Sequence, residues 1–100
     1  MYRIRFRNII SANKVVLFMK GTPSLLACGL SAEIYRLLKQ NRWEFKTTDL
    51  MQDPELCNFL QKVNSPSCCP FLYIEEKFIG GHDEIIELFN EKRLFNPAEN

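Results

Sequence analysis

The sequence predicts an α/β domain in which a four-stranded mixed sheet carries helices on both faces. Two extended segments are each followed by an amphipathic stretch, as in two successive strand–helix units. Two further short apolar segments, separated only by Glu75-Glu76, predict a hairpin, and a last amphipathic stretch follows them. The expected order is helix, strand, helix, strand, helix, strand, strand, helix.

Composition and charge are those of one small globular domain, which we expect to span residues 1–100. Hydrophobic residues make up 46% and charged residues 25% of the chain, which is ordinary for a folded protein. The net charge of +1 gives no reason to expect a nucleic-acid partner or an anionic membrane. No apolar run approaches the roughly 20 residues that a membrane-spanning helix needs.

The first segment, residues 1–14, allows two interpretations, a helix or an extended arm. Apolar side chains alternate with arginine at its start, which is typical of a strand. The spacing of Phe6, Ile9 and Ile10, with Asn13 as a helix end, is typical of a short amphipathic helix instead. The segment is basic, as transit peptides are, but it is too short to be set aside as one.

The next elements form the two strand–helix units. The apolar segment Val15–Met19, rich in β-branched residues, predicts a buried strand. Residues 32–39 have helical spacing, and we expect this helix to end near Asn41. A second strand is expected over residues 43–50 because its threonines suit an extended chain.

The second half of the chain begins with a well-marked helix start. Asp53 is a favourable N-cap, and Pro54 suits the first helical position. The residues expected on the inner face of this helix are Leu56, Phe59, Leu60 and Val63.

The hairpin and the last helix complete the domain. The hairpin strands are expected over residues 71–74 and 77–79, and Asp83 can cap the helix that follows. Residues 94–100 are expected to form a frayed tail. The expected apolar face of the last helix consists of Ile85, Ile86, Leu88 and Phe89.

The loop over residues 20–31 links the first strand to its helix and places Cys28 near the helix start. Helix N-termini carry partial positive charge and free N–H groups, which lower the pKa of a thiol. The resulting thiolate is both a nucleophile and a metal ligand. Cys28 could instead be a buried structural residue. In open α/β sheets, sites form beyond the carboxyl ends of strands, where this loop lies.

The chain has four cysteines, Cys28, Cys57, Cys68 and Cys69. We expect thiol chemistry or metal binding rather than disulfides, because no secretory signal peptide is expected. Adjacent strand residues face opposite sides, so at most one of Cys68 and Cys69 should approach Cys28. Cys69 could lie on the rim of the site, or its side chain could turn into the core.

Four motifs in register carry a resemblance to a known family. They are Lys-Gly-Thr-Pro at residues 20–23, Cys-Gly-Leu-Ser at 28–31, Cys-Pro-Phe-Leu-Tyr-Ile at 69–74 and Phe-Ile-Gly-Gly-His-Asp at 78–83. Together they resemble the monothiol glutaredoxins of the Cys-Gly-Phe-Ser type, in the thioredoxin-fold superfamily. The resemblance extends over nearly the whole chain.

The resemblance implies that Cys28 is the active-site cysteine and ligates a 2Fe-2S cluster. That cluster is shared between two protomers, each of which adds one glutathione thiolate. Lys20 then holds a glutathione carboxylate, and His82 with Asp83 binds the γ-glutamyl end. The positions implied for glutathione binding are Lys20, Cys57, Cys69, Pro70, Gly81, His82 and Asp83.

The sequence departs from the family pattern at several places. Leu30 replaces the phenylalanine of the signature, and Ser31 stands where dithiol relatives keep a second cysteine. Cys57 stands where an arginine usually binds the glycine carboxylate of glutathione, so weaker binding is expected. Each assignment has a structural alternative: Lys20 as a solvated lysine, Asp83 as a helix cap, Cys57 as a half-buried small residue, and His82 as a spectator.

Two functions follow from the resemblance. The first is a carrier that binds glutathione and a 2Fe-2S cluster and transfers the cluster in iron–sulfur protein assembly. The second is an enzyme, a glutathione-dependent oxidoreductase that removes glutathione from mixed disulfides through Cys28. The carrier would form a homodimer on cluster binding and would meet apo iron–sulfur proteins and a regulatory partner protein. The expected location is the bacterial cytosol, or an organelle matrix.

Overall fold

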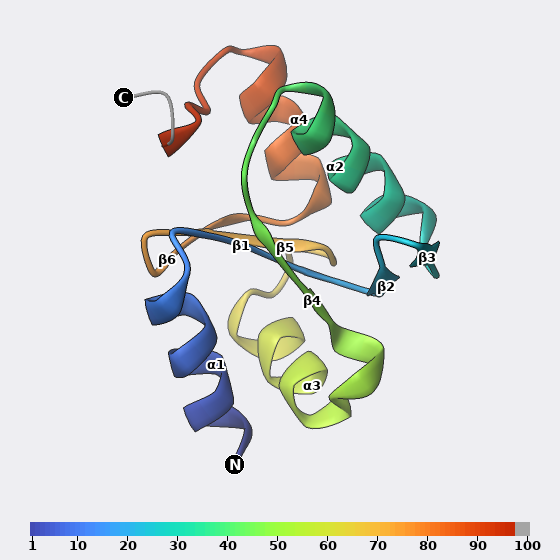
Figure 1. Cartoon of the computed structure of the whole chain (residues 1–100), viewed down its shortest axis with the longest axis vertical. Coiled ribbons are helices and arrows are strands. Elements are labelled where there is room, and N and C mark those ends of the chain that lie inside the picture. Colours follow the sequence, from blue (N-terminus) through green and yellow to red (C-terminus); the bar gives the residue numbers. More distant parts are fainter. Residues whose placement is uncertain (98–100) are drawn as a thin grey trace.

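The computed structural model describes residues 1–97, and its centre is a mixed sheet of four strands in the order β4-β1-β5-β6 (Figure 1). Strand β1 (Val15–Met19) runs parallel to β4 (Lys46–Asp49) and antiparallel to β5 (Phe71–Ile74). Strand β6 (Lys77–Gly80) completes the hairpin with β5. The predicted α/β class with a four-stranded mixed sheet is confirmed.

Helices cover both faces of this sheet (Figure 1). Helices α1 (Tyr2–Ala12) and α3 (Pro54–Val63) lie on one face. Helices α2 (Gly29–Gln40) and α4 (His82–Asn90) lie on the other. Within residues 1–97, no helix is long and apolar enough to cross a membrane.

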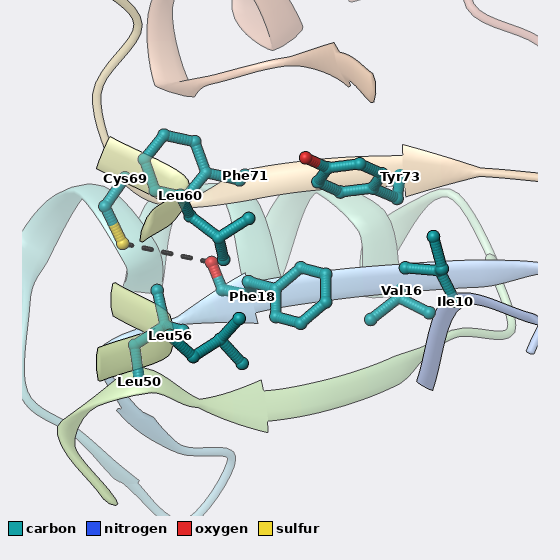
Figure 2. Packing of buried hydrophobic residues seen from close by; sticks show 9 residues of the cluster. All are labelled: Ile10, Val16, Phe18, Leu50, Leu56, Leu60, Cys69, Phe71 and Tyr73. Carbon is teal, nitrogen blue, oxygen red and sulfur yellow. Dashed lines mark hydrogen bonds between the residues drawn. The ribbon is translucent and has the colours of Figure 1, made fainter. Parts of the chain in front are cut away.

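The two faces hold separate hydrophobic clusters, because successive strand residues point to opposite sides. Figure 2 shows the cluster between the sheet and helices α1 and α3. Its buried members are Ile10, Val16, Phe18, Leu50, Leu56, Leu60, Cys69, Phe71 and Tyr73. The cluster beneath α2 and α4 contains Val15, Leu17, Met19, Ile34, Leu38, Trp43, Leu72 and Ile85.

The first segment is a helix, which settles the two interpretations of residues 1–14. As a helix it packs Phe6 against the sheet, with ring centroids 5.3 Å from Tyr73 and 5.7 Å from Phe18. The helix ends at Asn13, whose Nδ2 donates a hydrogen bond of 2.9 Å to the Ile9 carbonyl. The strand interpretation is wrong: an extended chain would put Ile9 on the opposite side from Phe6 and Ile10, whereas the helix packs all three against the same cluster.

Several expected boundaries require correction. The strand expected over residues 43–50 is limited to β4, because Trp43 is buried against Phe89 and a short 3₁₀ helix (Leu50–Gln52) follows. Helix α3 begins as predicted, with the Asp53 carboxylate accepting from the Leu56 N–H. Val63, however, is 55% exposed and does not belong to the inner face.

The last helix starts two residues earlier than a cap at Asp83 would require. Gly81 is the N-cap, and the Glu84 carboxylate accepts from its N–H at 2.8 Å. The Asp83 side chain is 92% exposed in the first turn, so the predicted N-cap is wrong.

The frayed tail expected from residue 94 is also wrong over its first residues. Leu94 packs against the core. Asn96 is buried, and its side chain donates to the Arg42 carbonyl at 3.3 Å. Residues 98–100 of the expected tail lie outside the described residues.

Candidate active site

Four segments meet at the carboxyl end of β1. The register pairs Met19 with Asp49 at the end of β4 and Phe18 with Phe71 at the start of β5. The start of α4 joins them, because the His82 N–H donates to the Cys68 carbonyl at 3.0 Å. The sheet topology therefore brings four segments to one edge: the loop after β1, the end of β4, the Cys68–Pro70 segment and the first turn of α4.

The loop after β1 is a small ordered structure. Strands β2 (Gly21–Thr22) and β3 (Leu25–Leu26) pair antiparallel within it. Gly21 has φ +100°, and a Cβ at this position would lie 2.5 Å from the Leu25 carbonyl oxygen, so the turn requires glycine.

Asp49 fixes this loop to the sheet, and the sequence analysis missed it. Its Oδ1 accepts from the Gly21 N–H at 2.8 Å and from the Met51 N–H at 2.9 Å. Asp49 stands at the end of the second predicted strand. Since parallel neighbouring strands end at the same edge of a sheet, this position could have indicated a contact with the loop after the first strand.

Cys28 is the N-cap of α2, with the extended backbone angles φ −140° and ψ 129°. The pKa of its thiol is lowered, mainly because the Ser31 N–H donates to the sulfur, against an opposing effect of burial. The Leu30 N–H, the Ser31 hydroxyl and the Lys20 ammonium lower this pKa further. The structure thus places the thiol where a helix N-terminus stabilises its anion.

Ser31 and Cys69 form a buried polar contact behind this thiol. The Ser31 Oγ accepts from the Lys20 N–H at 3.1 Å and lies 3.8 Å from the Cys69 Sγ. The Cys69 Sγ donates to the Phe18 carbonyl oxygen at 3.8 Å, as Figure 2 shows. Burial raises the pKa of the Cys69 thiol to about 11.

This arrangement decides between the two alternatives for Cys69. Its side chain is only 8% exposed and belongs to the core cluster, so the expectation of a thiol on the rim is wrong. The Cys69–Pro70 peptide bond is cis. Cys68, in contrast, is exposed to solvent.

Gly81 lets the start of α4 approach this segment closely. It is buried, and a Cβ built on it would overlap the Cys68 carbonyl oxygen and would lie 2.9 Å from the Cys68 nitrogen. The close approach places the first turn of α4 at the site edge. The N-terminus of this nine-residue helix can receive a carboxylate.

His82 connects the two helices that border the site. Its Nε2 lies 2.6 Å from Glu33 Oε1 on α2, and its Nδ1 lies 2.8 Å from Asp83 Oδ1. The pKa of His82 is raised, first by the hydrogen bond to Glu33 and then by that to Asp83. The His82 side chain thus has two partners within the fold, and Glu33 is a second residue that the sequence analysis missed.

Of the two other positions that the resemblance implies, Lys20 offers a cation to a carboxylate and Cys57 does not. Lys20 is partly exposed and forms no ion pair within residues 1–97, so its ammonium can bind an anion. Cys57 is half-buried on α3 and packs against the core cluster. In the part of the chain that the structure describes, no three His, Cys, Asp or Glu side chains converge to hold a metal ion.

Comparison with known proteins gives three findings. The glutaredoxin family model matches residues 15–79. An uncharacterized monothiol glutaredoxin of Synechocystis is 32% identical over 97 residues, which cover 97% of this chain and 91% of the relative. A probable monothiol glutaredoxin 2 of Rickettsia felis is 39% identical over 87 residues, covering 87% of this chain and 84% of the relative.

Solved structures agree with this assignment. The solution structure of reduced poplar apo GrxS14 superposes with a TM-score of 0.79 at 30% identity, over 97% of this chain and 89% of that chain. A buckwheat glutaredoxin–glutathione complex shares the fold with a TM-score of 0.78 at 23% identity, over 94% of this chain and 84% of that chain. The motifs around Cys28, the fold that assembles them and these relatives together show that the chain belongs to the glutaredoxin family, in its monothiol branch.

Proposed function

We propose that the protein carries a 2Fe-2S cluster as cargo, held by Cys28, and donates it to apo iron–sulfur proteins. The observation that carries the proposal is the position of Cys28, a partly exposed thiol whose pKa is lowered at the start of α2. Thiolates are the usual ligands of such clusters. Cys28 is the one thiol of the described chain that combines these properties.

The ligand count supports a shared cluster. A 2Fe-2S cluster takes four ligands, whereas Cys69 is buried with a raised pKa and cannot serve as a second one. Two copies of the chain would supply two Cys28 thiolates, and two glutathione molecules would supply the others. The cluster would therefore hold a homodimer together.

Glutathione has charged groups that match this edge of the molecule. Lys20 offers a cation to one carboxylate, and the first turn of α4 offers N–H groups to the other. Asp83, exposed beside these N–H groups, can pair with the ammonium group. The buckwheat protein of the same fold, which was solved as a glutathione complex, supports the same ligand class.

A cysteine exchange tests the proposal. We expect Cys28→Ser to abolish both the visible absorbance of the cluster and dimer formation after anaerobic reconstitution with iron, sulfide and glutathione. Cys68→Ser removes an exposed thiol and is the matched control, which should assemble the cluster normally. A glutathione-dependent 2Fe-2S dimer formed by Cys28→Ser would contradict the proposal.

The lowered pKa of Cys28 also favours a second activity, the removal of glutathione from mixed disulfides. The Cys28 thiolate would attack the glutathione sulfur and release the substrate thiolate, which takes up a proton. A second glutathione thiolate would then attack the Cys28–glutathione disulfide, releasing oxidised glutathione and restoring Cys28. Release of the substrate thiol by the wild type and not by Cys28→Ser would establish this activity.

A further inference from the structure

His82 already contacts one oxygen, Oδ1, of the Asp83 carboxylate that a ligand's ammonium group would use. Its ring lies between Glu33 on α2 and Asp83 on α4, at 2.6 Å and 2.8 Å. The His82 side chain is only 14% exposed, whereas Asp83 is 92% exposed. The imidazole is therefore held in place while the carboxylate remains open to solvent on its other side.

We propose that His82 is a specificity-determining residue that competes with the ammonium group of glutathione for Asp83, so that ligand binding is coupled to loss of the His82 proton. The inference rests on the proposed function, because it assigns the γ-glutamyl end of glutathione to this edge. It differs from that function by naming a competitor within the chain itself.

The physical argument is one of linkage. A protonated His82 forms ion pairs with both carboxylates, so its single positive charge offsets part of the negative charge of Asp83. A ligand ammonium that pairs with Asp83 places a second positive charge beside the imidazolium, which disfavours the protonated ring. The ammonium would contact Asp83, the direct partner of the imidazole, whereas the ligand carboxylate would meet backbone N–H groups of α4. We therefore expect binding to lower the pKa of His82 and, by reciprocity, deprotonation of His82 to tighten binding.

Two carboxylates are the charged groups that act on the His82 ring, so the coupling depends on them. Glu33 from α2 and Asp83 from α4 are the charged groups that raise its pKa. The Glu84 carboxylate is engaged by the Gly81 N–H at 2.8 Å. From the segment before β5, Cys68 meets His82 through its backbone carbonyl, which accepts from the His82 N–H.

Two titrations test the proposal in the Cys28→Ser background, which removes the pH dependence of the active thiol. The first follows the imidazole signals by NMR with and without S-methylglutathione. His82 is the only histidine, so these signals need no assignment. The second measures S-methylglutathione affinity by calorimetry between about pH 5.5 and pH 8, a range that brackets ordinary histidine titration.

We expect S-methylglutathione to lower the His82 pKa and to bind more tightly by roughly fivefold or more at the upper pH. His82→Gln, which keeps a hydrogen-bonding side chain without the charge, should bind with little pH dependence. The N-acetyl derivative, which lacks the ammonium group, should not shift the His82 pKa downward.

An unchanged His82 pKa at saturation, or the same pH dependence in His82→Gln, would overturn the competition while leaving glutathione binding intact. Absence of binding by the Cys28→Ser protein and by the wild type at every pH would refute the glutathione site itself, and with it this inference. The two failures are therefore distinguishable.

Discussion

At the scale of single residues, Cys57 is the clearest departure from the family pattern. It is half-buried on α3, where the resemblance implies an arginine for the glycine carboxylate of glutathione. Lys20 can supply a point charge but not the two parallel hydrogen bonds of a guanidinium. The chain therefore has a weakened receptor for one end of the proposed ligand.

We expect Cys57→Arg to tighten glutathione binding by roughly 1.5–3 kcal/mol, the range for hydrogen bonds to charged groups. Calorimetric titration with glutathione measures the change. Asn58→Arg adds the same charge one residue further along α3, at an exposed position that helical geometry turns to another side, and should have little effect. Equal tightening by both variants would show a general charge effect and would contradict the assignment of Cys57.

The thiols should differ in reactivity in the order that their surroundings dictate. Cys28 has a lowered pKa and should be alkylated first, at a pH below that at which an ordinary thiol reacts. Cys69 should react last, because its pKa is raised to about 11 and its side chain is buried. Timed alkylation of the native protein followed by peptide mapping measures the order; labelling of Cys69 before Cys68 would contradict it.

At the scale of elements, the start of α4 depends on close packing rather than on a side-chain cap. A Cβ on Gly81 would overlap the backbone of Cys68, which belongs to the segment before β5. We expect Gly81→Ala to lower the free energy of unfolding by about 1–3 kcal/mol, as overpacking does. It should also weaken glutathione binding, because the N–H groups of α4 must move away from the site edge.

Gly29→Ala is the control for this substitution. A Cβ on Gly29 would meet no atom within 4 Å at the start of α2, so alanine should be neutral or slightly stabilising. Urea unfolding of the two variants measures both effects. Equal destabilisation by the two alanines would attribute the effect to glycine replacement in general rather than to the contact with Cys68.

At the scale of the whole molecule, one ion pair ties the first helix to the third. The Arg5 guanidinium donates two hydrogen bonds of 2.8 Å to the Asp53 carboxylate. This contact lowers the pKa of Asp53, and the Leu56 N–H at the start of α3 lowers it further. The stabilisation is therefore present above the unfolded-state pKa of Asp53 and is lost as pH falls through the folded-state pKa.

We expect Arg5→Gln to lower the urea midpoint at pH 7 and to lose most of that difference under acid conditions that protonate Asp53. Arg93→Gln removes a more exposed pair with Glu91 and should change the midpoint less at every pH. Unfolding curves at several pH values measure the difference. A pH-independent effect of Arg5→Gln would show that lost packing of the arginine, rather than its charge, is responsible.

The sequence by itself determined the features that depend on near neighbours in the chain. The apolar run of β1, the Asp53-Pro54 start of α3 and the Glu75-Glu76 hairpin each follow from local patterns, and the structure confirms them. The position of Cys28 before a helix belongs to the same group, because loop length and helical spacing place it. Local backbone preferences and short-range periodicity are written in the sequence directly.

Only the tertiary structure decided the features that depend on distant segments. The first segment forms the helix Tyr2–Ala12 because Phe6 packs against Phe18 and Tyr73, which are distant in the sequence. The Cys69 side chain points into the core because its thiol donates to the Phe18 carbonyl oxygen and packs within the core cluster. The sequence alone left open whether this side chain faced the core or the rim of the site.

The link between Glu33 and His82 likewise joins residues that are 49 positions apart. Their pairing depends on how α2 and α4 pack side by side over the sheet, and no local pattern encodes that distance. The motifs of the candidate site could thus be identified from the sequence. The contacts of His82 with Glu33 and Asp83 form only when the fold brings α2 against the start of α4.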